Sequence, residues 1–151
     1  MLNYNREDYV KTVSELKLLP NIINPIKKLK ENNFLIIVIT NQSAINRGLT
    51  TIEEVQKINT SIQNSLEDHG TLIDKFYVCP HTPSENCDCR KPKIGLLLNA
   101  ASDFQISLNL SWIIGDNDSD IKAGISAGCK TIKINNEIDL AKAAKIILKN
   151  A

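Results

Sequence analysis

The chain has 151 residues, of which 42% are hydrophobic and 23% are charged, and its formal net charge is +1. This size and composition predict one globular domain, residues 1–151, with a single core. A near-neutral charge with no long basic run argues against nucleic acid or a membrane surface as a partner. No apolar stretch is long enough to span a bilayer, and the polar opening MLNYNRED lacks a signal-peptide pattern. We therefore expect a cytoplasmic protein that binds a small ligand; the sequence leaves its oligomeric state open, and a monomer is compatible with it.

Helical and extended patterns alternate along the chain. Residues 1–17 form a polar arm that we expect to be a loop. From Asn21 to the Asn32-Asn33 pair, apolar residues recur at helical spacing, and residues 34–39 (FLIIVI) form an unbroken apolar run typical of a parallel strand covered on both faces. Further strands are predicted at 73–78, 112–115 and 129–134, and further helices at 51–70 (with a Thr51/Glu54 capping box), 95–104, 121–128 and 140–148. This order predicts an α/β fold, a parallel sheet with helices on both faces.

Four potential metal ligands lie in one short loop, in the pattern C-x-H-x5-C-x-C: Cys79, His81, Cys87 and Cys89. Three thiolates and one imidazole fill every position of a tetrahedral zinc ion and leave none for a substrate, so we predict a structural zinc site. Disulfides or unrelated thiols are the alternative, but the one remaining cysteine, Cys129, lies in an apolar context that indicates a small core residue. Arg90 and Lys91 come directly after the loop, where the metal would hold them toward an anionic ligand.

Two polar clusters come after predicted strands. The first, after residues 34–39, contains Thr40, Asn41, Gln42 and Ser43, with Arg47 further along the same loop; the second, after residues 112–115, reads DNDSD from Asp116 to Asp120. The first cluster fits either a ligand site at the carboxyl end of a parallel strand or an ordinary turn. In the second, Asp116 and Asp120 can converge on one hard cation while Asp118 is the N-cap of the next helix, or all three can serve as caps.

These clusters and the zinc loop all fall at the carboxyl ends of predicted parallel strands, where they would converge. Hydroxyl and amide donors, two fixed cations and carboxylates for Mg²⁺ together make a phosphoryl-transfer site, in which donors and cations neutralise the phosphate oxygens. The sequence therefore predicts a phosphate site with Mg²⁺ as a catalytic cofactor and Zn²⁺ as a structural one.

Three segments, IIVITNQSAINRG, FYVCPHTPSENCDCRKPKIG and IIGDNDSDIKAG, resemble in this order the haloacid dehalogenase (HAD) superfamily of phosphatases. The resemblance is to the branch that contains D-glycero-D-manno-heptose 1,7-bisphosphate phosphatase and histidinol-phosphate phosphatase, because a zinc loop running into RKPK is peculiar to it. It covers most of the chain. It implies a Rossmann-like HAD fold and a hydrolase of phosphoric monoesters whose substrate is a small phosphorylated metabolite, either a heptose bisphosphate or histidinol phosphate.

The resemblance also implies roles for individual residues. Thr40 would bind the transferring phosphoryl group, Lys91 would steady its charge, and Asp116 would hold Mg²⁺, with Asp120 in a supporting position. The implied substrate-binding residues are Asn41, Gln42, Ser43, Arg47, Arg90 and Asn117. Family members often carry lysine where this chain has Asn117.

One motif of the family is not found in the sequence. HAD phosphatases attack phosphorus with the first aspartate of a D-x-D-G-T motif that ends their first, central strand, and use the second as acid and base. The 151 residues contain no such motif, and MLNYNREDYV resembles the residues that come directly after it in the family. We therefore expect a domain truncated at its amino terminus and lacking that strand between strands 34–39 and 112–115, so that two apolar edges face each other.

A start assigned at an internal methionine is the interpretation we favour, over a gap filled by another segment or chain, or a rearranged fragment. On this view the 151 residues alone are inactive as a phosphatase. The alternative function is a non-catalytic phosphate-binding or partner-completing HAD-like protein.

Overall fold

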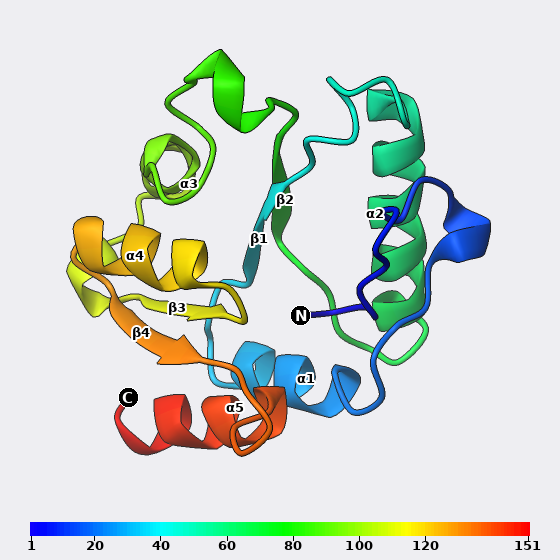
Figure 1. Cartoon of the computed structure of the whole chain (residues 1–151). Coiled ribbons are helices and arrows are strands. Elements are labelled where there is room, and N and C mark those ends of the chain that lie inside the picture. The colour runs from blue at the N-terminus through cyan, green and yellow to red at the C-terminus, as the bar shows by residue number, and fades with distance from the viewer.

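The computed structural model describes residues 1–151 and confirms the α/β architecture (Figure 1). The helices are α1 (Ile23–Glu31), α2 (Ile52–Glu67), α3 (Gly95–Phe104), α4 (Asp118–Ser126) and α5 (Leu140–Lys149). The strands are β1 (Ile37–Asn41), β2 (Lys75–Cys79), β3 (Trp112–Gly115) and β4 (Lys130–Lys133), and short 3₁₀ turns lie at Val13–Glu15, Pro83–Glu85 and Leu108–Leu110. No helix combines the length and the apolar composition that crossing a membrane requires.

The four strands form two separate parallel pairs. β1 pairs with β2, which places Ile37 opposite Lys75, and β3 pairs with β4, which places Trp112 opposite Lys130. The two pairs are not hydrogen-bonded to each other. A cavity of about 720 Å³, lined mostly by hydrophobic side chains, includes residues of both β1 and β3. This arrangement leaves one edge of β1 and one edge of β3 bordering the same cavity.

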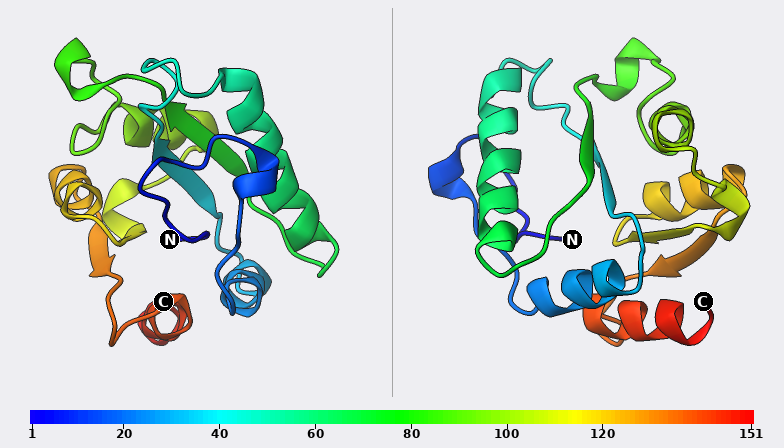
Figure 2. Two further views of the ribbon diagram at one scale, coloured as in Figure 1. Left: turned by 45° about the vertical axis from the view of Figure 1, so that its right-hand side comes forward. Right: turned by 180° about the vertical axis from the view of Figure 1, so that it is seen from behind.

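Helices cover both faces of each pair, as the sequence predicts. α2 lies against one face of β1 and β2 and α3 lies on the other, as the view from behind in Figure 2 shows. α4 covers one face of β3 and β4, while α5 lies on the other face beside α1. One hydrophobic cluster joins α1, α2 and the start of α5 through Ile26, Ile62 and Leu140. A second joins α1, β4 and α5 through Leu29, Ile132 and Ala144.

The first strand differs from the predicted one in position and in burial. β1 starts at Ile37 because the preceding residues are held by other contacts: the backbone N–H of Phe34 donates to the Leu29 carbonyl, and that of Ile36 donates to the Asp74 carboxylate at 2.7 Å. Every β1 residue is only partly buried. α2 and α3 cover the two faces of the pair as predicted, but the β1 residues stay partly exposed because one edge of the strand borders the cavity.

Local signals place the helix ends. Thr51 caps α2 by accepting a hydrogen bond from the Glu54 N–H, which confirms the predicted cap, and Asp139 caps α5 by accepting from the Lys142 N–H at 2.8 Å. Just beyond α2, Gly70 adopts a φ of +73°, the left-handed conformation that glycine tolerates best. The predicted cap of α4 was wrong: Asn117, not Asp118, occupies the N-cap position.

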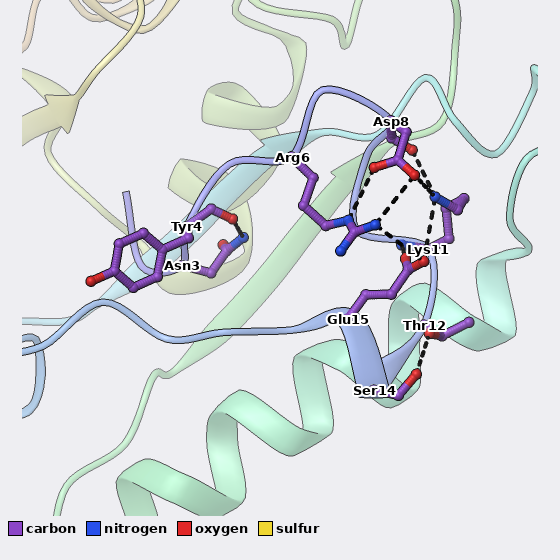
Figure 3. Close-up of polar contacts among 8 residues, drawn as sticks. All are labelled: Asn3, Tyr4, Arg6, Asp8, Lys11, Thr12, Ser14 and Glu15. Carbon is purple, nitrogen blue, oxygen red and sulfur yellow. Dashed lines mark hydrogen bonds and ion pairs between the residues drawn. The ribbon is translucent and has the colours of Figure 1, made fainter.

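The amino-terminal arm, predicted to be a loop, contains some regular structure. Asn3 forms an isolated bridge with Leu18, and a 3₁₀ turn spans Val13–Glu15. Figure 3 shows four alternating charges on this arm that pair with one another: Arg6, Asp8, Lys11 and Glu15. Hydrogen bonds from Arg6, and then from Lys11, hold the pKa of the Asp8 carboxyl well below its usual range. These pairs fix the course of an otherwise polar segment over α2.

Candidate functional site

The candidate site lies at the carboxyl ends of β1 and β3, where Lys91 is its central residue. The Lys91 ammonium lies 2.6 Å from Asp120 Oδ1 and donates a hydrogen bond to the Ile39 carbonyl at 2.7 Å. Lys91 therefore touches β1 and the first turn of α4 at once. Thr40, Lys91, Asp116 and Asp120 all line the 720 Å³ cavity, so residues far apart in the sequence share one space.

Asn41 holds the Lys91 backbone in place. Its side-chain amide donates to the Lys91 carbonyl at 3.2 Å, and its side-chain oxygen accepts from the Lys91 N–H at 3.1 Å. The end of β1 is thereby fastened to the segment that leaves the cysteine loop. Asn41 was predicted to contact substrate, and in the structure both ends of its amide are engaged with protein.

Asp120 is buried, with 6% of its surface exposed, and packs directly on Gly115. A Cβ atom added at Gly115 would lie 2.5 Å from Asp120 Oδ2, so no larger residue fits there without moving the carboxylate. That same oxygen accepts a hydrogen bond from the Asn117 N–H at 3.1 Å, which closes the capping box of α4. Asp120 thus acts as a cap and as the partner of Lys91.

Asp116 lies directly after β3 and keeps part of its carboxylate accessible. It accepts a hydrogen bond from the Asn117 side-chain amide at 3.0 Å, and its Oδ2 lies 3.3 Å from the amino group of Met1. The side chain is 31% exposed. A carboxylate oxygen is the ligand type that Mg²⁺ prefers, so the chemistry of this side chain suits a magnesium ligand.

Asp118 lies outside this arrangement. Its exposed carboxylate pairs with Lys133 on β4, and the hydrogen bond from that lysine lowers the pKa of Asp118. It does not line the cavity.

The loop after β1 divides into residues that line the cavity and residues that do not. Thr40 Oγ1 accepts a hydrogen bond from the Gln42 side-chain amide at 3.0 Å, which leaves its own hydroxyl proton available for a ligand, and both residues line the cavity. Ser43 is buried and Arg47 donates to its hydroxyl at 3.5 Å, while Arg90 donates to the His81 carbonyl at 3.3 Å. These last three predicted substrate residues do not line the cavity, whereas Asn117 does.

The four predicted zinc ligands converge. One ligand atom from each of Cys79, His81, Cys87 and Cys89 lies within 4.8 Å of all the others. The thiol sulfurs are 3.0 to 3.7 Å apart, and His81 Nδ1 lies 3.1 Å from the Cys89 sulfur. Ligands of a tetrahedral zinc ion with Zn–S bonds of about 2.3 Å lie at comparable separations, and all four cysteines of the chain are free thiols. The donor set fits one zinc ion, and this ion would supply structural cross-linking only.

The thiols of this cluster differ in acidity. Burial opposes ionisation of Cys87, but hydrogen bonds from the Arg90 and Cys89 backbone N–H groups outweigh it and lower the Cys87 pKa to about 7. Burial, followed by hydrogen bonds and the charges of Cys79 and Cys87, raises the pKa of Cys89 to about 12. One thiol is therefore ready to lose its proton at neutral pH, whereas another needs a cation beside it to do so.

Two contacts missed from the sequence tie the cysteine loop to its surroundings. Glu85 accepts a hydrogen bond from the Thr82 N–H at 2.6 Å and two from the Asn46 side-chain amide at 2.9 and 3.1 Å, which links the loop to the one after β1. At the start of α3, a Cβ on Gly95 would lie 2.5 Å from the Asp88 carbonyl, so the helix closely approaches the loop. The T-P-S-E capping pattern at residues 82–85 is the signal that could have revealed the first contact.

A parallel α/β fold with an acidic cluster and a lysine at the carboxyl ends of its strands is the arrangement expected of the HAD class. The HAD-hydrolase-like family model matches residues 88–147. The structure also superimposes on that of D,D-heptose 1,7-bisphosphate phosphatase from B. bronchiseptica, which was determined with magnesium and phosphate bound. The TM-score is 0.90 at 25% sequence identity, and the match covers 100% of this chain and 94% of that one.

Relatives found by sequence similarity indicate a particular family within this class. The D-glycero-β-D-manno-heptose-1,7-bisphosphate 7-phosphatase of Helicobacter pylori (strain ATCC 700392 / 26695) is 40% identical over 123 residues, covering 81% of this chain and 71% of that protein. The enzyme of the same name from Pseudomonas putida is 31% identical over 134 residues, covering 89% and 77%. The chain belongs to this family of heptose bisphosphate phosphatases.

Proposed function

We propose that the chain carries the phosphate-binding and metal-binding parts of a Mg²⁺-dependent phosphatase that removes one phosphate from a heptose bisphosphate. The observation that carries this proposal is that Thr40, Lys91, Asp116 and Asp120 line one cavity. The names of the relatives favour the heptose bisphosphate over histidinol phosphate, the other substrate that the resemblance implies.

Each residue has a task in this proposal. The Thr40 hydroxyl donates a hydrogen bond to a phosphoryl oxygen, and the Lys91 ammonium offsets the negative charge that grows on the phosphoryl group during transfer. Asp116 would hold Mg²⁺, which neutralises further charge on the phosphate oxygens when bound. Asp120 keeps Lys91 at the cavity wall. Gln42 orients the Thr40 hydroxyl through their hydrogen bond.

The attacking carboxylate is assigned to a segment outside these residues. Asp120 is engaged with Lys91 and with the cap of α4, and Asp116 would hold the cation in this proposal. The 151 residues contain no D-x-D-G-T sequence, in which the first aspartate would attack phosphorus and the second would transfer the proton. We accordingly expect turnover only when such a segment is supplied.

The test measures phosphate release from D-glycero-β-D-manno-heptose 1,7-bisphosphate, with Mg²⁺ present. The chain is assayed alone and joined to an amino-terminal D-x-D-G-T strand, with histidinol phosphate as the competing substrate. We expect release only from the joined protein and only from the heptose substrate. Thr40→Val and Lys91→Met should lose turnover, and the matched exposed variant Thr60→Val should keep it. This result would assign the phosphatase activity to the candidate site.

Two results would contradict the proposal. A joined protein that is folded and hydrolyses neither substrate excludes the phosphatase function. If such a protein still binds inorganic phosphate with Mg²⁺, the non-catalytic phosphate-binding alternative takes its place.

A further inference from the structure

The cluster of predicted zinc ligands contains three thiols that lie against one another. The Cys79 sulfur is 3.0 Å from the Cys89 sulfur and 3.7 Å from that of Cys87, and the sulfurs of Cys87 and Cys89 are 3.5 Å apart. The fourth thiol of the chain, Cys129, is not part of the cluster. The residues that fit a zinc ion therefore also bring together the sulfurs that a disulfide requires.

Of the three possible pairs, Cys79 and Cys89 suits a disulfide best. These two sulfurs are the closest, and the residues are ten apart in the chain. Cys87 and Cys89 are only two apart, so little chain is available to turn their Cβ atoms toward each other as a disulfide demands. The sulfurs of Cys79 and Cys87 are the most widely separated of the three pairs.

Contacts that involve no metal hold the backbone on both sides of this pair. Cys79 is the last residue of β2 and lies opposite Asn41 of β1, and its carbonyl accepts from the Gln42 N–H at 2.7 Å. The Asn41 side chain also bonds to the backbone of Lys91, which lies two residues after Cys89. The end of β1 thus fixes both segments, and the two sulfurs stay close without a bound ion.

The three thiols differ in their access to solvent. Cys79 is fully buried, with 0% of its surface exposed, whereas Cys87 and Cys89 are partly exposed. Cysteines that bind a metal do so as thiolates, and the thiolate is also the form that peroxide oxidises. A dissolved oxidant therefore reaches Cys87 or Cys89 first, while Cys79 lies behind them as the thiolate that completes a disulfide.

We propose that Cys79 and Cys89 are a redox-active pair, which hydrogen peroxide converts from zinc ligands into a disulfide. The Cys89 thiolate attacks one peroxide oxygen; an S–O bond forms, the O–O bond breaks and hydroxide leaves. The Cys79 thiolate then attacks the sulfur of this sulfenic acid, so that an S–S bond forms, the S–O bond breaks and a second hydroxide leaves. The two sulfurs lose two electrons to the peroxide, and protons from solvent convert both hydroxides into water.

Oxidation that begins at Cys87 leads to the same product. Either neighbouring thiolate resolves the Cys87 sulfenic acid, and the third thiolate then attacks the new disulfide, because all three sulfurs lie within 3.7 Å of one another. Exchange ends at Cys79–Cys89, the pair whose backbone is already held in place.

The disulfide removes the zinc site and keeps the loop closed. Only His81 and Cys87 remain as ligands, which are too few for a structural zinc ion. The bond between Cys79 and Cys89 still cross-links the segment that leads to Lys91, so this segment remains fastened after the metal has left. A dithiol reductant returns both thiols and with them the metal site. The inference concerns the loop alone and does not rest on the proposed function.

The test treats the zinc-loaded natural chain with a small excess of hydrogen peroxide. We expect release of one zinc ion per chain, measured with a colorimetric chelator, and loss of two of the four free thiols. Mass spectrometry of proteolytic peptides should show Cys79 joined to Cys89. The thermal midpoint of the oxidised chain should be about 5 °C above that of the reduced zinc-free chain, because a cross-link restricts the unfolded state. Dithiothreitol followed by zinc should reverse every change.

Two variants isolate the pair. Cys87→Ser removes the competing thiol of the cluster and is expected to form the Cys79–Cys89 disulfide with peroxide even where it holds little zinc. Cys129→Ser, which alters the thiol outside the cluster, is the matched control and should respond as the natural chain does.

Several results would overturn the inference. A main product that joins Cys87 or Cys129 to another cysteine excludes the assigned pair, as does a Cys87→Ser variant that forms no disulfide. Zinc release accompanied by sulfinic acids in place of a disulfide excludes the resolving role of Cys79. Zinc retained in excess peroxide shows that the cluster is inert to oxidation. An oxidised chain no more stable than the reduced zinc-free chain shows that the disulfide does not replace the metal as a cross-link.

Discussion

Two hydrogen bonds, of 3.1 and 3.2 Å, connect the Asn41 side chain to the Lys91 backbone. Because Lys91 lies two residues after the last cysteine of the loop, this pair joins the end of β1 to the metal-binding segment. The position of the Lys91 ammonium therefore depends on an asparagine fifty residues earlier in the chain.

The first prediction concerns this pair. Asn41→Ala removes both hydrogen bonds and leaves a partly buried N–H and carbonyl unpaired, so we expect the free energy of unfolding to fall by about 2 kcal/mol. The measurement is urea unfolding followed by tryptophan fluorescence. Asn64→Ala, an exposed asparagine on α2, is the control and should change stability little. Equal stability in the two variants would show that the pair does not hold the segment.

Gly115 provides the second prediction. In Gly115→Ala the new methyl group would lie 2.2 Å from Asp120 Cβ, so the carboxylate must move away from Lys91 and from the α4 cap. We expect a loss of stability of about 2 kcal/mol or more from overpacking, together with weaker phosphate binding. Gly48→Ala is the control: nothing lies within 4 Å of its Cβ, and only its φ of +73° is unfavourable, at about 1 kcal/mol. A Gly115→Ala variant as stable as the natural chain would exclude the close contact.

The third prediction is the metal content. We expect one zinc ion per chain by atomic emission spectroscopy, and removal by a chelator should lower the thermal midpoint because the four ligands lie within one short loop. Cys87→Ser should lose most of the zinc. Cys129→Ser, which alters a buried thiol far from the cluster in sequence, should keep it. Zinc retained by both variants would mean that the cluster is not the site.

The fourth prediction is a dependence on pH. The hydrogen bond from the Thr82 N–H, and then that from Asn46, lower the pKa of Glu85 below its ordinary value of 4.5. A depressed pKa stabilises the folded state above pH 4.5, and this contribution is lost as the pH falls through the folded-state value. The natural chain should therefore exceed Glu85→Gln in stability at pH 7, and the difference should shrink in acid. A difference that stays constant from pH 7 to pH 3 would contradict the assignment.

Local signals made much of the fold predictable. The Thr51 cap, the strand and helix order and the cysteine spacing depend on neighbouring residues, and the structure confirms the cap and the convergence of Cys79, His81, Cys87 and Cys89. The choice between Asn117 and Asp118 as the α4 cap failed, because both are good caps and the deciding contact is the Asp120 carboxylate on the Asn117 N–H.

The contacts between residues far apart in the sequence could not be predicted from local patterns. No pattern near Lys91 indicates that its ammonium reaches the Ile39 carbonyl, because the two are 52 residues apart. Likewise, Ser43 and Arg47 look like ligand residues in sequence, but Arg47 donates to the Ser43 hydroxyl and neither lines the cavity. The roles of the individual site residues therefore remain predictions that the variants above can test.

The contact between α1 and α5 has a consequence for how the molecule unfolds. Leu29 of α1 packs in one cluster with Ile132 of β4 and Ala144 of α5, while Ile26 of α1 packs with Ile62 of α2. α1 is thus shared by the side that holds β1 and β2 and the side that holds β3 and β4. Melting of either side would expose the apolar face of this helix, which couples the unfolding of the two sides.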